Sequence, residues 1–238
     1  MDIVFRCDPN LEAHVPQPQP ARSALPDWLR SMPANAHSSL LDQPIRTVKQ
    51  CPPFLDAMQY GFMMPLPCDI DVRDGVFSWD WPVPEPAAAQ HPRAPLSFHV
   101  PAQVEGSPMA RDGQVVVKFN SFWTVELPAG WSLLAMPPAN RDDLPFRPLT
   151  GLVDADQYHD VGILFPAVWT DPNFEGRLER GTPVVQCIPV PRQSFNLRCE
   201  TMDADQTAEF DRLGRSLTTE TGVYRRAYRA RRSNDESS

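Results

Sequence analysis

Acidic residues and a histidine stand close together in one short stretch of the C-terminal half. Asp154 and Asp156 are two residues apart and are followed by Tyr158, His159 and Asp160. On a strand, residues two apart share a face, so the two carboxylates could converge on one cation or one water molecule. In a turn, the same acids would instead accept hydrogen bonds from backbone amides. Both alternatives are open at the level of sequence.

If the chain is an enzyme, the simplest mechanism uses these acids for hydrolysis. Asp154 or Asp156 would orient the attacking water, or would hold a divalent metal ion that does so. His159 would carry a proton or bind the metal. Arg141 and Arg147, which lie just upstream, would face the negative charge of the substrate. This interpretation predicts a small polar ligand, with a nucleotide as one candidate class, bound near the turn.

A different class of enzyme would need a transition metal. A non-haem iron oxygenase-like centre uses two histidines and one carboxylate, and His99 and His159 with Asp154 would supply them. The sequence contains neither a His-x-Asp nor a His-x-x-x-His spacing to support this set. It also lacks the Gly-x-Ser-x-Gly, Gly-x-Gly-x-x-Gly and P-loop patterns. A divalent metal is therefore the one cofactor that the sequence suggests, and only as an alternative.

Charge and composition limit the partners. The net charge of −8 disfavours a general nucleic-acid-binding protein, whose surface should be basic. The exception is Tyr224–Arg232, which holds five arginines; it could bind phosphates or an acidic partner, or could pair with acids of its own molecule. No apolar run reaches 18 residues, so we expect no membrane span. Five cysteines without a Cys-x-x-Cys pair, and an N-terminus unlike a signal peptide, predict a cytoplasmic protein with reduced thiols.

Proline is the outlier of the composition, at 28 of 238 residues. Because each proline removes a backbone donor, long helices and long central strands are disfavoured over most of the chain. Disorder is excluded as the explanation, since 42% of the residues are hydrophobic and include six Trp and 12 Phe. We therefore expect a mainly β protein of short elements.

The pattern of residues predicts where these elements lie. Pro52 and Pro53 should start a short helix over 53–60, which Gly61 ends. Helical spacing of Phe210 and Leu213 predicts a C-terminal helix. The predicted strands are 2–6, 62–67, 70–72, 76–81, 96–100, 115–119, 122–127, 131–136, 150–154, 161–169 and 183–188. The expected organisation is a single β-rich domain over 1–200, which includes a Pro-rich N-terminal arm, followed by a helix and a disordered tail over 201–238.

Two family resemblances follow from particular segments. The segments Thr47–Gly61, Asn120–Pro128, Gly130–Asn140 and Thr150–Arg192 resemble a family of uncharacterised bacterial and phage domains. More remotely, Gly151-Leu-Val-Asp-Ala-Asp-Gln-Tyr158 and Gly181-Thr-Pro-Val-Val-Gln186 are similar to motifs of the dUTPase and dCTP deaminase superfamily. The chain lacks the Pro-Arg-Ser phosphate segment and the glycine-rich C-terminal arm of that superfamily.

The second resemblance implies a fold and a site. The fold would be a β-clip or distorted barrel with short helices. Asp154 would contact the sugar or orient water, Tyr158 would lie near the base, and Gln186 would be a ligand-binding residue on the strand that closes the barrel. Arms of the kind predicted here often pack on a neighbouring subunit, so a homo-oligomer is expected. The alternative from a different functional class is a non-catalytic interaction or assembly protein that uses its arms and aromatic surface.

Overall fold

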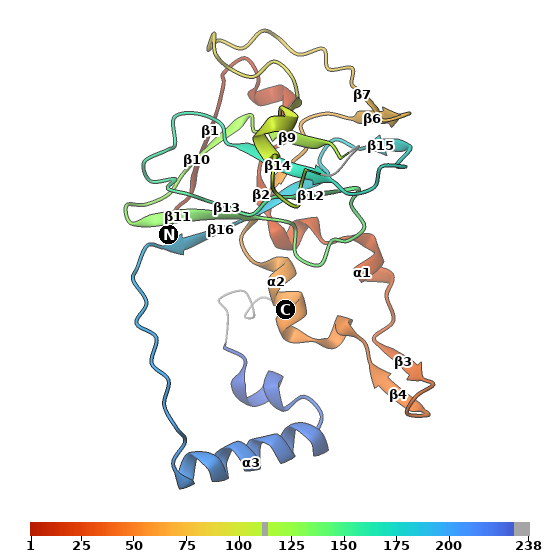
Figure 1. Ribbon diagram of the computed structural model, residues 1–238, viewed down its shortest axis with the longest axis vertical. Coiled ribbons are helices and arrows are strands. Elements are labelled where there is room, and N and C mark those ends of the chain that lie inside the picture. The colour runs from red at the N-terminus through yellow and green to blue at the C-terminus, as the bar shows by residue number, and fades with distance from the viewer. Residues whose placement is uncertain (111–113, 231–238) are drawn as a thin grey trace.

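The computed structural model describes residues 1–110 and 114–230. In these residues the chain is mainly β, with several antiparallel sheets and a few short helices, as the sequence predicts. Figure 1 shows the strands gathered in one body, from which a hairpin and a long C-terminal segment extend. In the part of the chain described, no helix combines the length and the apolar character needed to cross a membrane.

The largest sheet unites the segments that carry the superfamily resemblance. Its strand order is β13-β11-β16-β5-β2. The central strand pair is β11 and β16, in a register that places Trp131 opposite Pro191 and Met136 opposite Gln186. The strands are β2 (Gln19–Pro20), β5 (Phe62–Pro65), β11 (Trp131–Met136), β13 (Gly151–Val153) and β16 (Pro183–Pro191).

Strand β16 has nine residues and lies inside the sheet, although the proline content disfavours long central strands. Its register explains the exception. The amide of Arg192 donates to Gly130 O at 2.8 Å, so the nitrogens at the alternate positions, which include Pro189 and Pro191, face away from β11. On that other side β5 ends its pairing at Cys187, opposite Phe62. The two prolines therefore cost the sheet no hydrogen bond.

Three further sheets complete the body and one hairpin extends from it. A four-stranded sheet has the order β12-β14-β9-β8, a three-stranded sheet has the order β15-β6-β7, and β1 pairs with β10. Hairpin β3–β4 stands apart from the body in Figure 1. The bounds are β1 (Val4–Cys7), β3 (Asn35–Ser38), β4 (Gln43–Arg46), β6 (Ile70–Arg73), β7 (Val76–Ser78), β8 (Leu96–Phe98), β9 (Val116–Asn120), β10 (Trp123–Glu126), β12 (Phe146–Pro148), β14 (Leu164–Trp169) and β15 (Gly176–Leu178).

The buried faces of these sheets form one apolar core. Ile70, Val117, Leu133 and Val185 come from four different strands and are almost fully buried in it. Aromatic rings close its edge, with Phe119, Phe146 and Trp169 packed in series. Burial of this apolar surface is the main force that stabilises the body.

The helices are short, with one exception. Helix α2 starts at Pro52 and ends before Gly61, close to the predicted 53–60. Gly61 is required there because its φ is +75° and a Cβ would lie 2.1 Å from Cys187 O. The α-helices are α1 (Asp27–Ser31), α2 (Pro52–Gln59) and α3 (Ala204–Thr219), with a π-helical turn at Tyr224–Tyr228 and 3₁₀ turns at Glu12–His14, Ala21–Ala24, Val48–Gln50 and Pro101–Val104.

The expected C-terminal helix is present as α3 and stops at Thr219, before Gly222, whose φ is +75°. The disordered tail predicted within 201–238 falls in part on residues 231–238, which lie outside the described residues. The division into a domain over 1–200 and a segment over 201–238 stays a prediction.

Candidate functional site

The two acids lie in a turn and not on a strand. β13 ends at Val153, and the amides of Gln157 and Tyr158 both donate to the backbone oxygen of Asp154, at 2.9 and 2.8 Å. The turn is pinned to the core by Ala155, which is fully buried and accepts a hydrogen bond from the amide of Leu127. Of the two alternatives, the structure therefore has the turn.

Arg192, at the end of β16, binds both acids. Its Nη1 lies 2.6 Å from Asp156 Oδ1 and 3.1 Å from Asp154 Oδ1, and its Nη2 contacts Asp156 Oδ2. Asp156 also accepts from the amide of Gly130 at 2.8 Å, and Asp154 accepts from Ser132 Oγ at 2.7 Å. The Asp156 side chain is 2% exposed and that of Asp154 is 60% exposed. The contacts join the ends of β11, β13 and β16.

These contacts weaken both acids as bases. The hydrogen bond from Arg192 holds the pKa of Asp156 far below its usual range, and the hydrogen bonds from Ser132 and Arg192 lower the pKa of Asp154. In return, the hydrogen bond to Asp156 raises the pKa of Arg192. A carboxylate with so low a pKa accepts a proton poorly, so the geometry favours a structural clamp at this turn over general-base catalysis.

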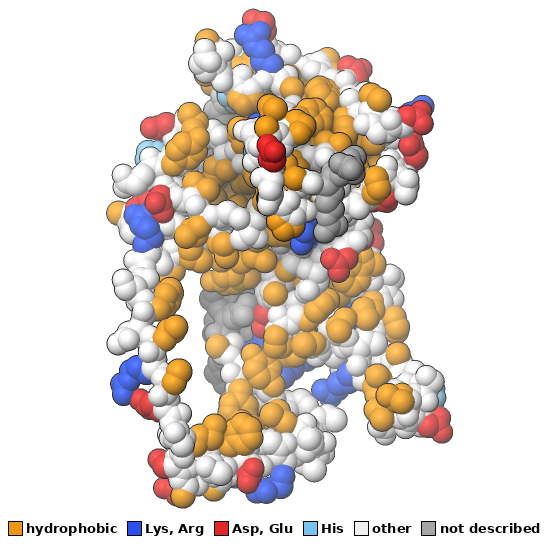
Figure 2. All heavy atoms as spheres, viewed as in Figure 1, with side chains coloured by type: hydrophobic (Ala, Val, Ile, Leu, Met, Phe, Trp, Pro, Cys, Tyr) orange, Lys and Arg blue, Asp and Glu red, His pale blue; other side chains and the backbone are white. Residues whose placement is uncertain are grey.

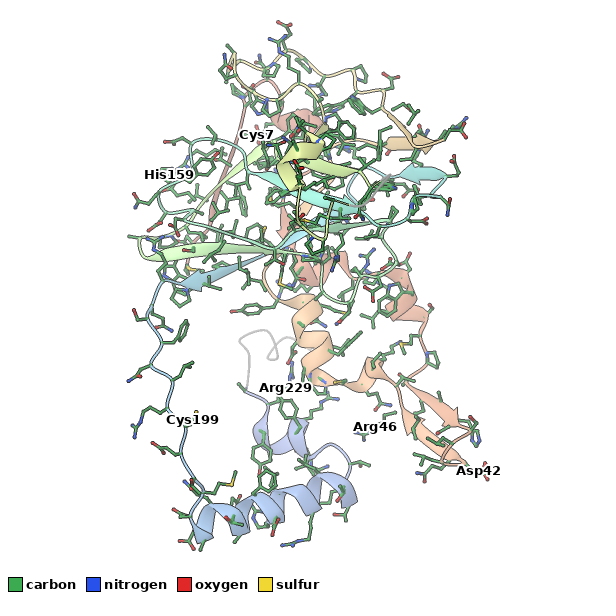
Figure 3. The ribbon with its side chains drawn as sticks, in the orientation of Figure 1. Cys7, Asp42, Arg46, His159, Cys199 and Arg229 are labelled. Carbon is green, nitrogen blue, oxygen red and sulfur yellow. The ribbon has the colours of Figure 1, made fainter. Side chains whose placement is uncertain are left out.

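His159 lies beyond the clamp, at the wall of a cavity of about 360 Å³. Its side chain is 28% exposed, and its Nδ1 is buried without a hydrogen bond. Asp160 Oδ1 lies 3.4 Å from that nitrogen, beyond the usual hydrogen-bond distance, and is itself exposed. Figure 3 labels His159 and Cys7, which line this cavity from the loop after β13 and from β1. We call it the His159 cavity.

Other residues that line the His159 cavity supply aromatic and polar groups. Phe122 lies 5.2 Å from the His91 ring, measured between ring centroids. Thr124 Oγ1 is buried and, like His159 Nδ1, has no hydrogen-bond partner. Asp8 also lines the cavity, and its carboxylate accepts hydrogen bonds from the amides of Ala87, Ala88 and Asn10, which lower its pKa. Burial raises the pKa of the Cys7 thiol to about 11, so this thiol is protonated at neutral pH.

The other predicted ligand-binding residues do not face this cavity. Arg141 binds Asp143 through Nε at 2.7 Å and Nη2 at 2.9 Å. Arg147 is exposed on β12, opposite Val168. Gln186 is fully buried and bonded to the backbone on three sides. Tyr158 is 51% exposed. The structure thus leaves His159 as the predicted residue that lines a cavity with unpartnered polar groups.

The predicted metal set is not assembled. His99 Nδ1 lies 3.1 Å from Gln103 Oε1 and lines a different cavity, with Phe98, Pro101 and Met109. Among the described residues, no three His, Cys, Asp or Glu side chains come together in a way that could hold a metal ion. The structure therefore does not bring His99, His159 and Asp154 together, because β8 and the loop after β13 carry the two histidines to separate cavities.

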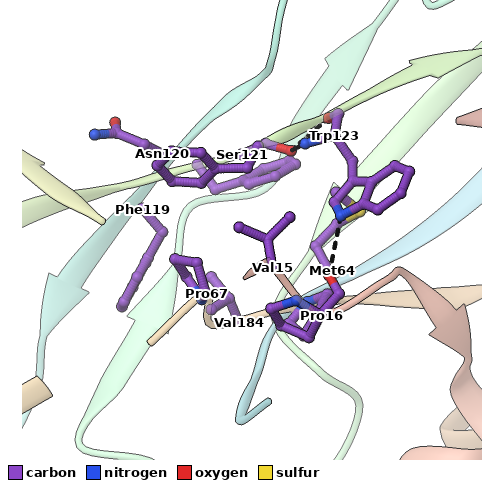
Figure 4. Close-up of a pocket in the computed structure, with 12 residues that line it drawn as sticks. Val15, Pro16, Met64, Pro67, Phe119, Asn120, Ser121, Trp123 and Val184 are labelled. Carbon is purple, nitrogen blue, oxygen red and sulfur yellow. Dashed lines mark hydrogen bonds between the residues drawn. The ribbon is translucent and has the colours of Figure 1, made fainter. Parts of the chain in front are cut away.

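A further cavity lies in the core and is small. Figure 4 shows it enclosed by apolar side chains such as Val15, Met64 and Val184. Trp123 Nε1 donates to Pro16 O at 3.0 Å and holds the N-terminal segment over it. Its volume of about 20 Å³ has room for about one water molecule.

Sequence reasoning missed Arg192, Thr124, Cys7 and His91. Arg192 follows a Pro-Val-Pro run and has no neighbouring acid in sequence, so its pairing with Asp156 depends on the alignment of β16 with β11. The three cavity residues come from separate segments of the chain. No local spacing could have grouped them.

Comparisons with known proteins give little more. No family model matches the chain, and neither does any curated protein. Among solved structures, a dUTPase from phage phi11 of S. aureus has 15% sequence identity and a TM-score of 0.28. The match covers 38% of this chain and 79% of the phage protein. The Staphylococcus bacteriophage 80alpha dUTPase, solved with dUpNHpp, has 17% sequence identity and a TM-score of 0.28. That match covers 38% of this chain and 72% of the bacteriophage protein. The similarity to both proteins is remote and partial.

Proposed function

We propose that this protein binds a small polar ligand in the His159 cavity. The observation that carries the proposal is the pair of buried polar atoms, Thr124 Oγ1 and His159 Nδ1, that have no hydrogen-bond partner in the wall of one cavity. A buried polar group without a partner costs roughly 1–3 kcal/mol. A ligand, with the small side-chain rotations that bring these atoms to it, would remove that cost.

The lining supports a ligand with a ring and polar edges. Phe122 and His91 provide an aromatic wall, while Thr124, His159 and Gln90 provide hydrogen-bonding groups. The volume of about 360 Å³ is near the lower end of the range for small-molecule sites. A nucleobase or nucleoside fits this combination of size and chemistry.

The β-clip form remains part of the proposal. It is supported by the position of β13 and β16 on either side of β11, because these strands carry the two motifs of the superfamily resemblance. Hydrolysis by water held at Asp154 or Asp156, with Arg141 and Arg147 facing a phosphate, is the less favoured extension. Arg192 already binds both acids, and Asp143 already binds Arg141.

Calorimetric titration with a panel of nucleobases, nucleosides and deoxynucleotides tests the proposal. The sharpest variant is Thr124→Val, which keeps the side-chain shape and removes a hydroxyl that has no partner in the unliganded protein. It should leave the unliganded fold as stable as wild type or slightly more stable, and should weaken binding about tenfold. His159→Ala should weaken binding at least as much.

Two controls decide between sites. His99→Ala, in the other cavity, should leave the dissociation constant unchanged. Asp154→Asn should also leave it unchanged. If Asp154→Asn abolishes binding while Thr124→Val has no effect, the ligand lies at the acidic turn and the proposal is wrong. If no compound of the panel binds the folded protein, the proposed ligand class is wrong.

A further inference from the structure

The segment that follows β16 leaves the body without packing on it. Residues 193–203 belong to no helix or strand, and each of them is exposed. Phe195 is 79% exposed and Leu197 is 89% exposed, although large apolar side chains are normally covered. Figure 1 shows this segment running apart from the strands to α3, and Figure 3 labels Cys199 within it. We call residues 193–229 the C-terminal arm.

Helix α3 of the arm is fixed by its own sequence but is not covered. Asp203 and Gln206 form a reciprocal capping box, with N···O distances of 2.8 and 3.0 Å. Phe210 and Leu217 project from the helix and are 65% and 52% exposed, and α3 contains no buried residue. Figure 2 shows apolar atoms on the side of α3 that faces the body. A single 16-residue helix is only marginally stable in water, so α3 needs a packing partner.

The end of the arm does have a defined binding place. Val223 is 8% exposed, and Arg229 binds Asp56 of α2 through two nitrogens, at 2.9 and 3.1 Å. The Arg229 and Asp56 side chains are 23% and 12% exposed, so the pair is largely shielded from solvent. Gly222 lies beside Arg46 of β4, since a Cβ there would be 3.7 Å from the guanidinium. We call this contact of residues 222–229 with α2 and β4 the C-terminal dock.

The dock also bears on the basic cluster of Tyr224–Arg232. Arg229 pairs with Asp56, and Arg226 pairs with Glu220 at 3.2 Å. Two of its arginines therefore pair with acids of this protein's own sequence. Arg231 and Arg232 lie outside the described residues.

We propose that the C-terminal arm is exchanged between two copies of this chain, so that residues 222–229 of each copy fill the dock of the other. Nothing in residues 193–203 ties the arm to its own body, and eleven extended residues span up to roughly 36 Å. The arm can therefore reach a neighbouring copy while the Arg229–Asp56 pair and the burial of Val223 are kept.

Exchange of the C-terminal arm explains why a single copy leaves apolar side chains of the arm exposed to water. In a symmetric dimer the two arms run past each other, and Phe195, Leu197 and the apolar side of α3 meet the second copy in place of water. A second copy is the occupant because the Asp56 carboxylate of the dock pairs with an arginine that this chain itself carries. This inference is independent of the ligand proposal.

A charge-exchange mixing experiment on the full chain tests it. In a dimer of the Asp56→Arg variant alone, Arg229 faces an arginine in each dock, and in a dimer of the Arg229→Asp variant alone, Asp56 faces an aspartate in each dock. Each variant alone should shift from dimer to monomer in size-exclusion chromatography with light scattering at tens of micromolar. When the two variants are mixed after mild unfolding and refolding, both docks of a mixed dimer regain opposite charges, and the dimer peak should return. The double variant Asp56→Arg/Arg229→Asp should be dimeric by itself.

The outcomes distinguish exchange between two copies from a dock that is filled by residues 222–229 of the same chain. If the double variant is restored but the mixture stays monomeric, the dock is filled by its own chain and the proposal is wrong. A monomeric wild type, or a dimer that survives both single variants, would also overturn it. Circular dichroism of each variant, with the β-sheet signal of wild type as reference, shows that the body has folded.

Discussion

The replacement of Gln186 by leucine should destabilise the protein strongly. This side chain is fully buried on β16. Its oxygen accepts from the amide of Ala139 at 2.8 Å, and its nitrogen donates to the backbone oxygens of Ala57 and Tyr60 at 2.8 and 2.6 Å. It thereby connects β16, the end of α2 and the loop after β11. Leucine has a similar size but can make none of these bonds.

The size of the effect follows from the three lost bonds. Each net hydrogen bond contributes about 1 kcal/mol, so the free energy of unfolding should fall by about 3 kcal/mol. For a chain of this length, that corresponds to a decrease in Tm of about 6–12 °C. Gln186→Glu should be at least as destabilising, because a carboxylate would face the oxygens of Ala57 and Tyr60.

Urea unfolding followed by circular dichroism measures this difference. Gln43→Leu is the matched control, since Gln43 is exposed on β4, and it should change the free energy of unfolding by less than about 0.5 kcal/mol. If Gln186→Leu lies within the same margin, the reasoning about its three bonds is refuted. If it keeps full stability but loses ligand binding, Gln186 is the ligand-binding residue that the superfamily resemblance implies.

Three further predictions follow from the described geometry. The Asp156 carboxyl has a lowered pKa in the folded protein, so its contribution to stability is present above the unfolded pKa of about 3.9 and is lost as the pH falls below that value. Arg192→Met should therefore reduce the loss of stability between about pH 4 and pH 2. If the free energy of unfolding, measured with urea, falls with pH as steeply as in wild type, the clamp is contradicted. Gly61→Ala should cost about 3 kcal/mol because of its positive φ and the close Cys187 oxygen, whereas Gly151→Ala, with open space around its Cβ, should be nearly neutral by the same assay. A thiol reagent should modify the exposed Cys199 first and the fully buried Cys187 only after unfolding, as peptide mass spectrometry would show.

Local rules in the sequence predicted much of the secondary structure. The Pro-Pro start and the glycine end of α2 are local signals, and the strand over 131–136 matches β11 exactly. The turn at Asp74-Gly75 joins β6 and β7 with φ of 51° and 72°, which suits an Asp-Gly pair. In each case the residues that decide the conformation are neighbours in the chain.

The candidate site could be predicted only in part, because its contacts join distant segments. The sequence singles out His159 as a candidate, but the residues that line the cavity with it include Cys7 of β1 and Thr124 of β10. The spacing of Asp154 and Asp156 favours a catalytic interpretation, because nothing in the sequence shows that Arg192 binds both of them. A short spacing in the sequence identifies side chains that can act together, but it does not show which other side chains of the protein already bind them.

The sequence by itself determined a mainly β chain of short elements and a C-terminal helix, since periodicity, prolines and glycines act locally, but it left open whether the acids at 154 and 156 lie on a strand or in a turn. Only the tertiary structure decided that they lie in a turn and what that turn does. The alignment of β16 with β11 brings Arg192 onto Asp154 and Asp156 and makes them a clamp, while the next residues of the same loop reach the His159 cavity. Strand order and register are set by burial of the whole core, and burial of the whole core cannot be read from any one segment.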